Sequence, residues 1–477
     1  MEVTSKATRI RLFSIDTPQM RAFHMTWFAF FLCFFAWFGI APLMKIVRDE
    51  MALTQSQIGW LVIGSVSITV VARLLIGWLC DRIGPRRAYT WLLLVGSLPV
   101  MGIGLAQDFQ TFLVFRLLIG VIGASFVITQ YHTSVMFAPN VVGTANATTA
   151  GWGNLGGGVT QLVMPIVLGI LTVGAYIPFT NIQFLPGLGL SDAAGWRVAM
   201  VVAGAMCALV GVAYYFLTQD APEGNYRELR AAGKLPPKQT VKGSFAAASR
   251  DPRVWVLFVI YGACFGIELT VNNVLALYFL DYFDFFASMS AVQAVQWAGA
   301  AAMVFGLMNV FARTLGGALG DLFGRRWGLS GRVRWLFLAL FAEGLALMLF
   351  SQMPVLALAI PALVVFSLFV QMSEGATYSV VPFINKKALG SVAGIVGAGG
   401  NAGAVLAGFL FRGAIPWPTA FFIIGALVTV TAFLAFAVRF DSATETEARS
   451  ALDAALAHRQ GGLAAGTGAA RTAEAAG

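Results

Sequence analysis

The sequence predicts an all-α membrane protein with twelve spanning helices in two repeats of six. The composition, the spacing of the apolar runs and an internal repeat predict this class. Apolar residue types make up 58% of the 477 residues and charged types only 11%, which is too few charges for a soluble surface of this size. Twelve spans of ~20 apolar residues would use roughly 240 residues, which this chain can supply.

Apolar runs long enough to cross a bilayer fall into two sets of six. They lie near 22–41, 58–80, 88–106, 111–137, 143–174 and 196–217, then near 254–280, 292–316, 333–352, 355–384, 389–411 and 417–440. We therefore expect an N-terminal bundle (1–217) and a C-terminal bundle (254–440). The basic, proline-containing segment 218–253 is predicted to be a cytoplasmic linker, and 441–477 a mobile cytoplasmic tail.

The basic residues predict the orientation of the chain. With the N-terminus inside, 24 of the 31 Lys and Arg lie in inner segments, four in outer loops and three within spans. Cytoplasmic loops of membrane proteins are enriched in Lys and Arg, so both termini are predicted to lie in the cytoplasm. The protein itself is predicted to be integral to the cytoplasmic (inner) membrane. The net charge of +9 therefore indicates topology rather than nucleic-acid binding.

The residue types that support metal or cofactor chemistry are scattered. The three histidines form no cluster, and the four cysteines lie in or beside apolar runs without a paired spacing. The sequence therefore predicts no metal site, no cofactor and no catalytic residues. A transporter fits this pattern better than an enzyme does.

Two motifs recur at nearly the same offset. Arg73 is followed by Gly, Asp and Gly at fixed spacing. The same pattern begins again 240 residues later, at Arg313. A Gly-Asn-x-Gly motif containing Asn154 returns 247 residues later around Asn401. Duplicated halves of about 240 residues around a central site are the architecture of many secondary transporters.

Both repeated arginines are expected near the middle of the membrane. Each lies eight residues before the aspartate of its motif, which is ~12 Å along a helix. The hydrocarbon core is ~30 Å thick, so a residue ~12 Å from the cytoplasmic end of its helix lies near the midplane. A buried arginine needs a partner, and two that converge on one cavity favour a planar oxyanion. The amides of Asn154 and Asn401 could donate further hydrogen bonds to it. The alternative is internal ion pairing with glutamates within the spans, which are Glu268, Glu343 and Glu374.

The motifs resemble those of a known family. The loops after the second and eighth runs, containing Gly-x3-Asp-x2-Gly and arginines, resemble the inner-loop signature of the major facilitator superfamily. Ala-Gly-Trp-Gly-Asn-Leu-Gly-Gly-Gly (150–158) and Gly-Ala-Gly-Gly-Asn-Ala-Gly (397–403) resemble the two signatures of the nitrate/nitrite porters. The resemblance implies a major facilitator fold and a transporter of nitrate, nitrite or both that works as a monomer in the lipid bilayer.

The resemblance also implies site residues. Arg73 and Arg313 lie where the family keeps its substrate arginines, and Phe126, Tyr261 and Phe265 match aromatic residues that line the substrate pocket. The pattern Arg116-x3-Gly120 resembles another general motif of the superfamily. Arg116 is therefore expected to form an internal salt bridge.

The segment around Glu268 resembles the branch that contains plant high-affinity transporters and type I NarK-like proteins, which implies import of nitrate with protons. Glu268 is then the first candidate for proton coupling, Glu374 the second and Glu343 the third. A structural ion pair of Glu268 with an arginine, nitrate/nitrite exchange, and transport of another small anion are the alternatives.

Overall fold

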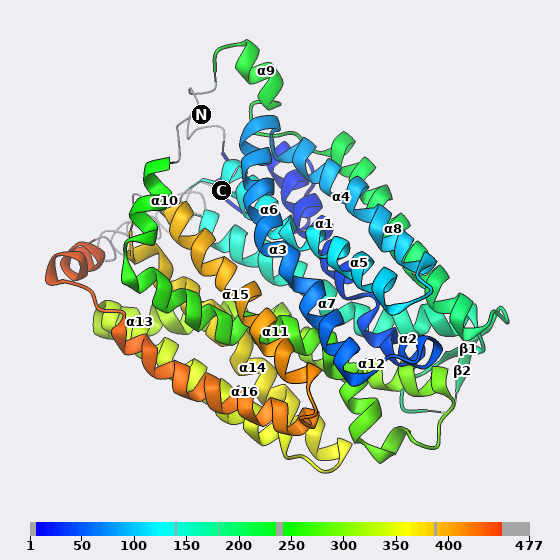
Figure 1. Cartoon of the computed structure of the whole chain (residues 1–477). Helices are drawn as coiled ribbons and strands as arrows, with labels where there is room; N and C mark the ends of the chain where they lie inside the picture. Colours follow the sequence, from blue (N-terminus) through cyan, green and yellow to red (C-terminus); the bar gives the residue numbers. More distant parts are fainter. Residues whose placement is uncertain (1–5, 139–140, 181, 235–241, 386–388, 451–477) are drawn as a thin grey trace, which may run out of the picture.

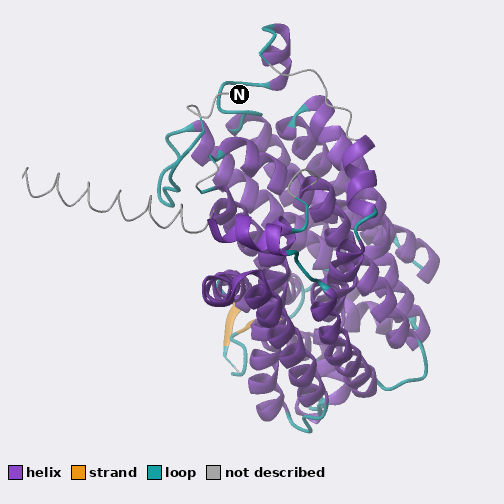
Figure 2. Ribbon diagram, turned by 90° about the vertical axis from the view of Figure 1, so that its left-hand side faces the viewer, coloured by secondary structure: helices purple, strands orange, loops and turns teal. Residues whose placement is uncertain are grey.

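Long helices packed side by side make up nearly all of the molecule (Figures 1 and 2). The computed structural model describes residues 6–138, 141–180, 182–234, 242–385 and 389–450. The strands β1 (Gly174–Tyr176) and β2 (Gln183–Pro186) form an antiparallel hairpin, the one sheet among these residues.

The first half of the chain contains six crossings. Its helices are α1 (Pro18–Phe38), α2 (Met44–Met51), α3 (Gln55–Ile83), α4 (Pro85–Gly102), α5 (Phe109–Ile119), α6 (Ser125–Met136), α7 (Val142–Leu171) and α8 (Asp192–Leu217). Helix α2 extends the first crossing. A 3-10 turn at Gly120–Ala124 joins α5 and α6 into one crossing.

The second half follows two short helices, α9 (Tyr226–Ala231) and α10 (Lys242–Ser249). Its helices are α11 (Pro252–Tyr282), α12 (Ala291–Leu307), α13 (Ala312–Ser351), α14 (Leu356–Val380), α15 (Leu389–Arg412) and α16 (Trp417–Ala432). Residues 442–450 are also helical.

The described residues contain 11 stretches long and apolar enough to span a membrane. One of them, Ala291–Ser351, has 61 residues, far more than the ~20 that one crossing requires. The backbone breaks within it at Trp327 and Gly328, where Gly328 has a φ of +66° that favours glycine. This stretch therefore accounts for two crossings, so the described residues contain the twelve predicted spans.

Local sequence signals explain where several helices begin. Thr17 and Ser191 accept hydrogen bonds from the first turns of α1 and α8. Thr54 and Gln57 form a capping box at the start of α3, and Asp108 caps α5. Such caps satisfy N–H groups that have no partner within the helix.

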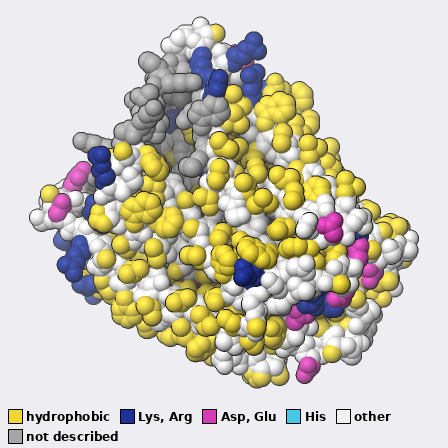
Figure 3. Space-filling view, in the orientation of Figure 1, with side chains coloured by type: hydrophobic (Ala, Val, Ile, Leu, Met, Phe, Trp, Pro, Cys, Tyr) yellow, Lys and Arg dark blue, Asp and Glu magenta, His cyan; other side chains and the backbone are white. Residues whose placement is uncertain are grey.

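The surface has the polarity expected of a membrane protein. Figure 3 shows apolar side chains across the middle of one face and most charged side chains towards its margins. Leu209, Phe216 and Val430 are 70%, 76% and 68% exposed, respectively. The broad apolar surface is consistent with contact with lipid.

The two ends of the bundle differ, and we name them by their contents. The linker end carries α9, α10 and the start of the described chain, and the hairpin end carries α2 and the β1–β2 hairpin (Figure 1). At the linker end, Asp220 accepts hydrogen bonds from the backbone N–H groups of Arg86 and Tyr226, 2.9 Å each. Burial raises the pKa of the Asp220 carboxyl, and these hydrogen bonds oppose that shift.

Charges of the repeated loop motif connect helix ends at the linker end. Arg86 donates to the carbonyl of Tyr215 at 2.8 Å. Arg332 pairs with Asp321 at 2.6 Å and donates to the carbonyl of Ser379 at 3.1 Å. The side chain of Asp81, the matching residue of the first motif, lies outside what the structure describes.

The two halves meet mainly through α3 against α15 and α7 against α12. Glycines allow the closest approach. A Cβ on Gly158 of α7 would lie 2.5 Å from the Cα of Gly306. The backbones of α7 and α12 can therefore touch only because neither residue has a side chain.

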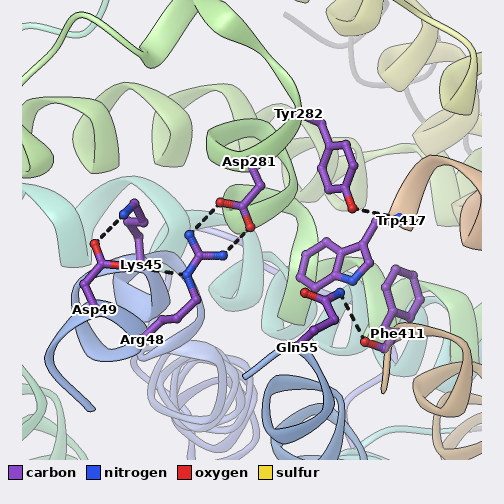
Figure 4. Close-up of polar contacts among 8 residues, drawn as sticks. All are labelled: Lys45, Arg48, Asp49, Gln55, Asp281, Tyr282, Phe411 and Trp417. Atoms are coloured by element: carbon purple, nitrogen blue, oxygen red, sulfur yellow. Dashed lines mark hydrogen bonds and ion pairs between the residues drawn. The ribbon is translucent and has the colours of Figure 1, made fainter. Parts of the chain in front are cut away.

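Hydrogen bonds between the halves close the hairpin end (Figure 4). Arg48 of α2 forms a two-pronged ion pair with Asp281 of α11, with Nη2 2.6 Å from Oδ1. Gln55 donates to the carbonyl of Phe411 at 3.4 Å. Gln161 of α7 donates to the carbonyl of Asn272 on α11 at 2.8 Å.

Replacing Gly158 with alanine should hold the hairpin end apart, because the new Cβ would meet backbone atoms. Overpacking of this kind costs about 1–3 kcal/mol. A chain carrying Arg48→Cys and Asp281→Cys, treated with a short bifunctional thiol reagent, should cross-link severalfold less in the Gly158→Ala background. Gly157→Ala is the matched control, because its Cβ would make only ordinary contacts, 3.4 Å or longer. Equal cross-linking in the two backgrounds would contradict the close-approach argument.

Candidate functional site

Arg73 lies on α3 at the interface between the halves and is 8% exposed. Its Nη1 donates to the carbonyl of Gly397 on α15 at 2.9 Å. Its Nε and Nη2 have no hydrogen-bond partner, and no Asp or Glu oxygen forms an ion pair with it among the described residues. Arg73 is therefore a buried cation with donors available to an anion.

Arg313 lies on α13, in the other half, and is also 8% exposed. It forms ion pairs with Glu374 of α14 and with Glu268 of α11, the latter at 3.4 Å. With the Asn154 amide turned so that its oxygen faces Arg313, this oxygen accepts from Nη1 and Nη2 at 3.0 Å each. Among the residues that the structure describes, the internal pairing left open by the sequence therefore exists for Arg313 but not for Arg73.

One aromatic ring lies beside both arginines. The ring centre of Phe265 is 5.9 Å from the Cζ of Arg73 and 5.7 Å from that of Arg313. Phe126 lies 5.7 Å from the Cζ of Arg73, and Tyr261 stacks on Phe265 with ring centres 5.2 Å apart. The structure thus brings the three predicted aromatic residues together around the two arginines.

The three glutamates have different surroundings. Glu268 is fully buried, and its Oε1 accepts hydrogen bonds from Asn309 at 2.8 Å and Gln371 at 3.2 Å. Glu374 contacts Arg313. Within the described parts of the chain, neither oxygen of the buried Glu343 has a hydrogen-bond partner. Two carboxylates therefore share the one guanidinium of Arg313.

Asn401 is placed differently from Asn154. Its Nδ2 donates to the carbonyl of Val66 on α3 at 3.4 Å, while its Oδ1 has no partner in the described segments. It connects α15 to α3, whereas Asn154 faces Arg313. The repeated Gly-Asn-x-Gly motifs thus make different contacts in the two halves.

Several site residues were not anticipated from the sequence. They are Asn309, Gln371, Tyr378 and the carbonyl of Gly397. Tyr378 packs edge-on against Tyr261 with ring centres 5.1 Å apart. Helical spacing could have identified two of the side chains, because Gln371 precedes Glu374 by three residues and Asn309 precedes Arg313 by four.

The formal charges of the four buried groups cancel when all are ionised. Arg73 and Arg313 supply two positive charges, and Glu268 and Glu374 supply two negative ones. Both carboxylates pair with Arg313, however. Arg73 retains uncompensated positive charge beside aromatic rings. The arrangement can bind a small planar anion through paired N–H donors.

Comparison with known proteins gives the class of protein that this fold and site define. The chain belongs to the Major Facilitator Superfamily, whose model matches residues 26–382. Solved structures agree on the fold. A bacterial homologue of the lysosomal transporter Spinster, inward-facing and unoccupied, has a TM-score of 0.63 at 16% identity, covering 91% of this chain and 99% of that one. A mutant of the nucleoside transporter NupG has a TM-score of 0.63 at 15% identity, covering 87% and 99%.

Relatives by sequence are more specific. The chain is 38% identical to "High affinity nitrate transporter 2.5" of Arabidopsis thaliana, over 86% of this chain and 77% of that protein. It is 37% identical to "High-affinity nitrate transporter 2.3" of Oryza sativa, over 85% and 74%. It is 30% identical to "Nitrate/nitrite transporter NrtP" of Picosynechococcus, over 81% and 84%. The predicted resemblance to nitrate/nitrite porters is confirmed.

Proposed function

We propose that this chain imports nitrate across the cytoplasmic membrane by alternating access, together with protons. The observation that carries this proposal is Arg73, a buried arginine at the interface of the halves with unpartnered donors and no carboxylate partner among the described residues. The choice of nitrate as the anion rests on the relatives. They include nitrate transporters from plants and nitrate/nitrite transporters from cyanobacteria.

Nitrate suits the chemistry of this site. It is flat and carries its charge on three oxygens, so the planar fork of an arginine can donate two hydrogen bonds to it. Arg73 and Arg313 hold the anion from opposite halves, next to the rings of Phe126, Tyr261 and Phe265. Asn154 positions Arg313, and the free amide hydrogen of Asn401 donates from α15.

The linker end is the cytoplasmic end in this proposal, because it carries most of the basic residues. The halves 1–217 and 254–440, connected by 218–253, rock about the central site as a monomer in the lipid bilayer. The Arg48–Asp281 pair closes the outer end in the state described here.

Proton coupling follows from the ion pairs of Arg313. Nitrate entry against ~100 mV, negative inside, costs about 2.3 kcal/mol in the electric field alone. Glu374 competes with nitrate for Arg313, so its protonation releases the guanidinium for the anion. Nitrate and a proton then bind together and cross together. Glu374 replaces Glu268 as the first candidate, because Asn309 and Gln371 already hold Glu268.

Nitrate/nitrite exchange is the second candidate function. The hydrogen bonds of Glu268 to two amides favour it, because a carboxylate held in this way serves as a fixed counter-charge for Arg313. An exchanger needs such a counter-charge but no group that gains and loses a proton.

Uptake under two separate gradients should distinguish the two candidates. Purified protein in proteoliposomes is given either an inward proton gradient with an empty lumen, or a nitrite-loaded lumen without a proton gradient. We expect nitrate to accumulate under the proton gradient alone. Accumulation only with internal nitrite would instead establish exchange. Protein-free vesicles, which should show neither response, are the control.

A further inference from the structure

A third arginine, Arg116 of α5, lies at the interface of the halves away from the central site. It is 2% exposed. Its Nη2 donates to the Oδ1 of Asn273 at 2.6 Å and its Nη1 to the carbonyl of Trp37 at 3.1 Å. Its Nε has no partner in the part of the chain that the structure describes. Among the described residues no carboxylate pairs with it, so the internal salt bridge expected from the sequence is not found.

The contrast with other arginines is informative. Arg48 and Arg197, near the hairpin end, are each paired with a carboxylate, Asp281 and Glu50 respectively. Arg116 is more deeply buried than either, yet its acceptors are uncharged oxygens. A buried guanidinium without a counter-charge is costly, and an anion would remove that cost.

Arg116 lies on the route between the hairpin end and the central site. Its neighbour Ser65, whose Oγ is 3.4 Å from the Oδ1 of Asn273, precedes Arg73 by eight residues on α3. Asn273 follows Phe265 by eight residues on α11. Both helices therefore place Arg116 ~12 Å from the central site, towards the hairpin end.

The contact of Arg116 with Asn273 crosses between the halves, whereas its other contacts do not. Trp37 and Arg116 both belong to the first half, where the indole of Trp37 also donates to the carbonyl of Ser65 at 2.7 Å. Asn273 belongs to the second half. Movement of the halves apart at the hairpin end would separate Asn273 from Arg116, while the contact with the Trp37 carbonyl stays within the first half. Nε and Nη2 of Arg116 would then both lack a protein partner.

We propose that Arg116 forms a second, outer binding site for a small oxyanion, occupied when the hairpin end is open. This inference rests on the proposed nitrate import. External nitrate binds Arg116 first and moves to Arg73 and Arg313. The amide oxygen of Asn273 then takes the place of an anion oxygen when the hairpin end closes, which opposes return of the anion to the outside.

Protection of an introduced cysteine tests this site. Ser65→Cys, in the Arg73→Gln background that weakens the central site, is treated from outside with a membrane-impermeant thiol reagent, with and without nitrate. The native cysteines are buried and give the background labelling. We expect nitrate to slow labelling, and we expect Arg116→Gln to abolish this protection while labelling itself persists. Two outcomes would overturn the proposal. One is absence of protection by nitrate in the Ser65→Cys, Arg73→Gln protein that retains Arg116. The other is protection that survives Arg116→Gln.

Transport kinetics give a second test that a purely structural role would not satisfy. Arg116→Gln in the otherwise unchanged chain should raise the KM for external nitrate about tenfold, as expected for loss of a charged donor, with kcat largely retained. A fall in kcat with an unchanged KM would assign Arg116 to helix packing instead. Wild-type uptake in the same vesicles tests the proposed function separately, because the wild type could transport nitrate whether or not Arg116 binds it.

Discussion

Arg73→Lys should reduce the apparent affinity for nitrate about 10- to 150-fold, which corresponds to the loss of one hydrogen bond to a charged group. Lysine keeps the positive charge but replaces the planar fork with a point charge. It also cannot reach the carbonyl of Gly397 and the anion with the same geometry. The measurement is the initial rate of nitrate uptake into proteoliposomes over a range of nitrate concentrations.

Arg449→Lys is the matched control, because Arg449 is exposed in the helix after residue 441 and far along the chain from both arginines. It should transport like the wild type. Arg73→Gln, which lacks the charge as well, should be more impaired than Arg73→Lys. Wild-type affinity in Arg73→Lys would rule out paired hydrogen bonding by this residue.

Glu374→Gln should abolish accumulation of nitrate driven by a proton gradient while leaving exchange of nitrate for nitrate across the membrane. Glutamine removes the negative charge that competes for Arg313 and cannot release a proton. In the wild type, nitrate affinity should rise as the external pH falls. The rise is up to about tenfold per pH unit over the range in which binding of one nitrate takes up one proton. In Glu374→Gln this dependence should disappear. The measurements are uptake under a proton gradient and nitrate binding from pH 5 to 8.

The other two glutamates are the comparison for this test. Glu268→Gln should weaken the site without removing the pH dependence, because Asn309 and Gln371 hold Glu268. Glu343→Gln changes a carboxylate that forms no ion pair with either arginine among the described residues. If either variant lost the pH dependence and Glu374→Gln kept it, the coupling proton would belong to that residue.

The sequence predicted the fold because its signals are local. Each span is a continuous apolar run, and the repeated Arg and Asn motifs carry the two-fold relation between the halves. The two spans joined in α13 were separated correctly in the sequence, since charged residues near Arg325 and Arg326 interrupt the apolar pattern there.

The partners of those arginines could not be predicted in the same way. Spacing along one helix does not specify how that helix is rotated against its neighbours. The sequence therefore ranked Glu268, Glu374 and Glu343 for proton coupling but could not say which of them pairs with an arginine. Among the described contacts only Glu268 and Glu374 reach Arg313. The different contacts of Asn154 and Asn401 have the same cause, because packing around the two motifs differs while their residues match.

The break in α13 has a consequence for shortening the chain. After Gly328 the helix restarts, and the first backbone N–H of the restarted segment, that of Leu329, donates to Glu445 at 2.7 Å. This acceptor lies beyond the last crossing, in the segment 441–477 that the composition predicts to be a mobile tail. A truncation after residue 440 would remove it and leave a helix start uncapped, whereas a truncation after residue 450 would retain it.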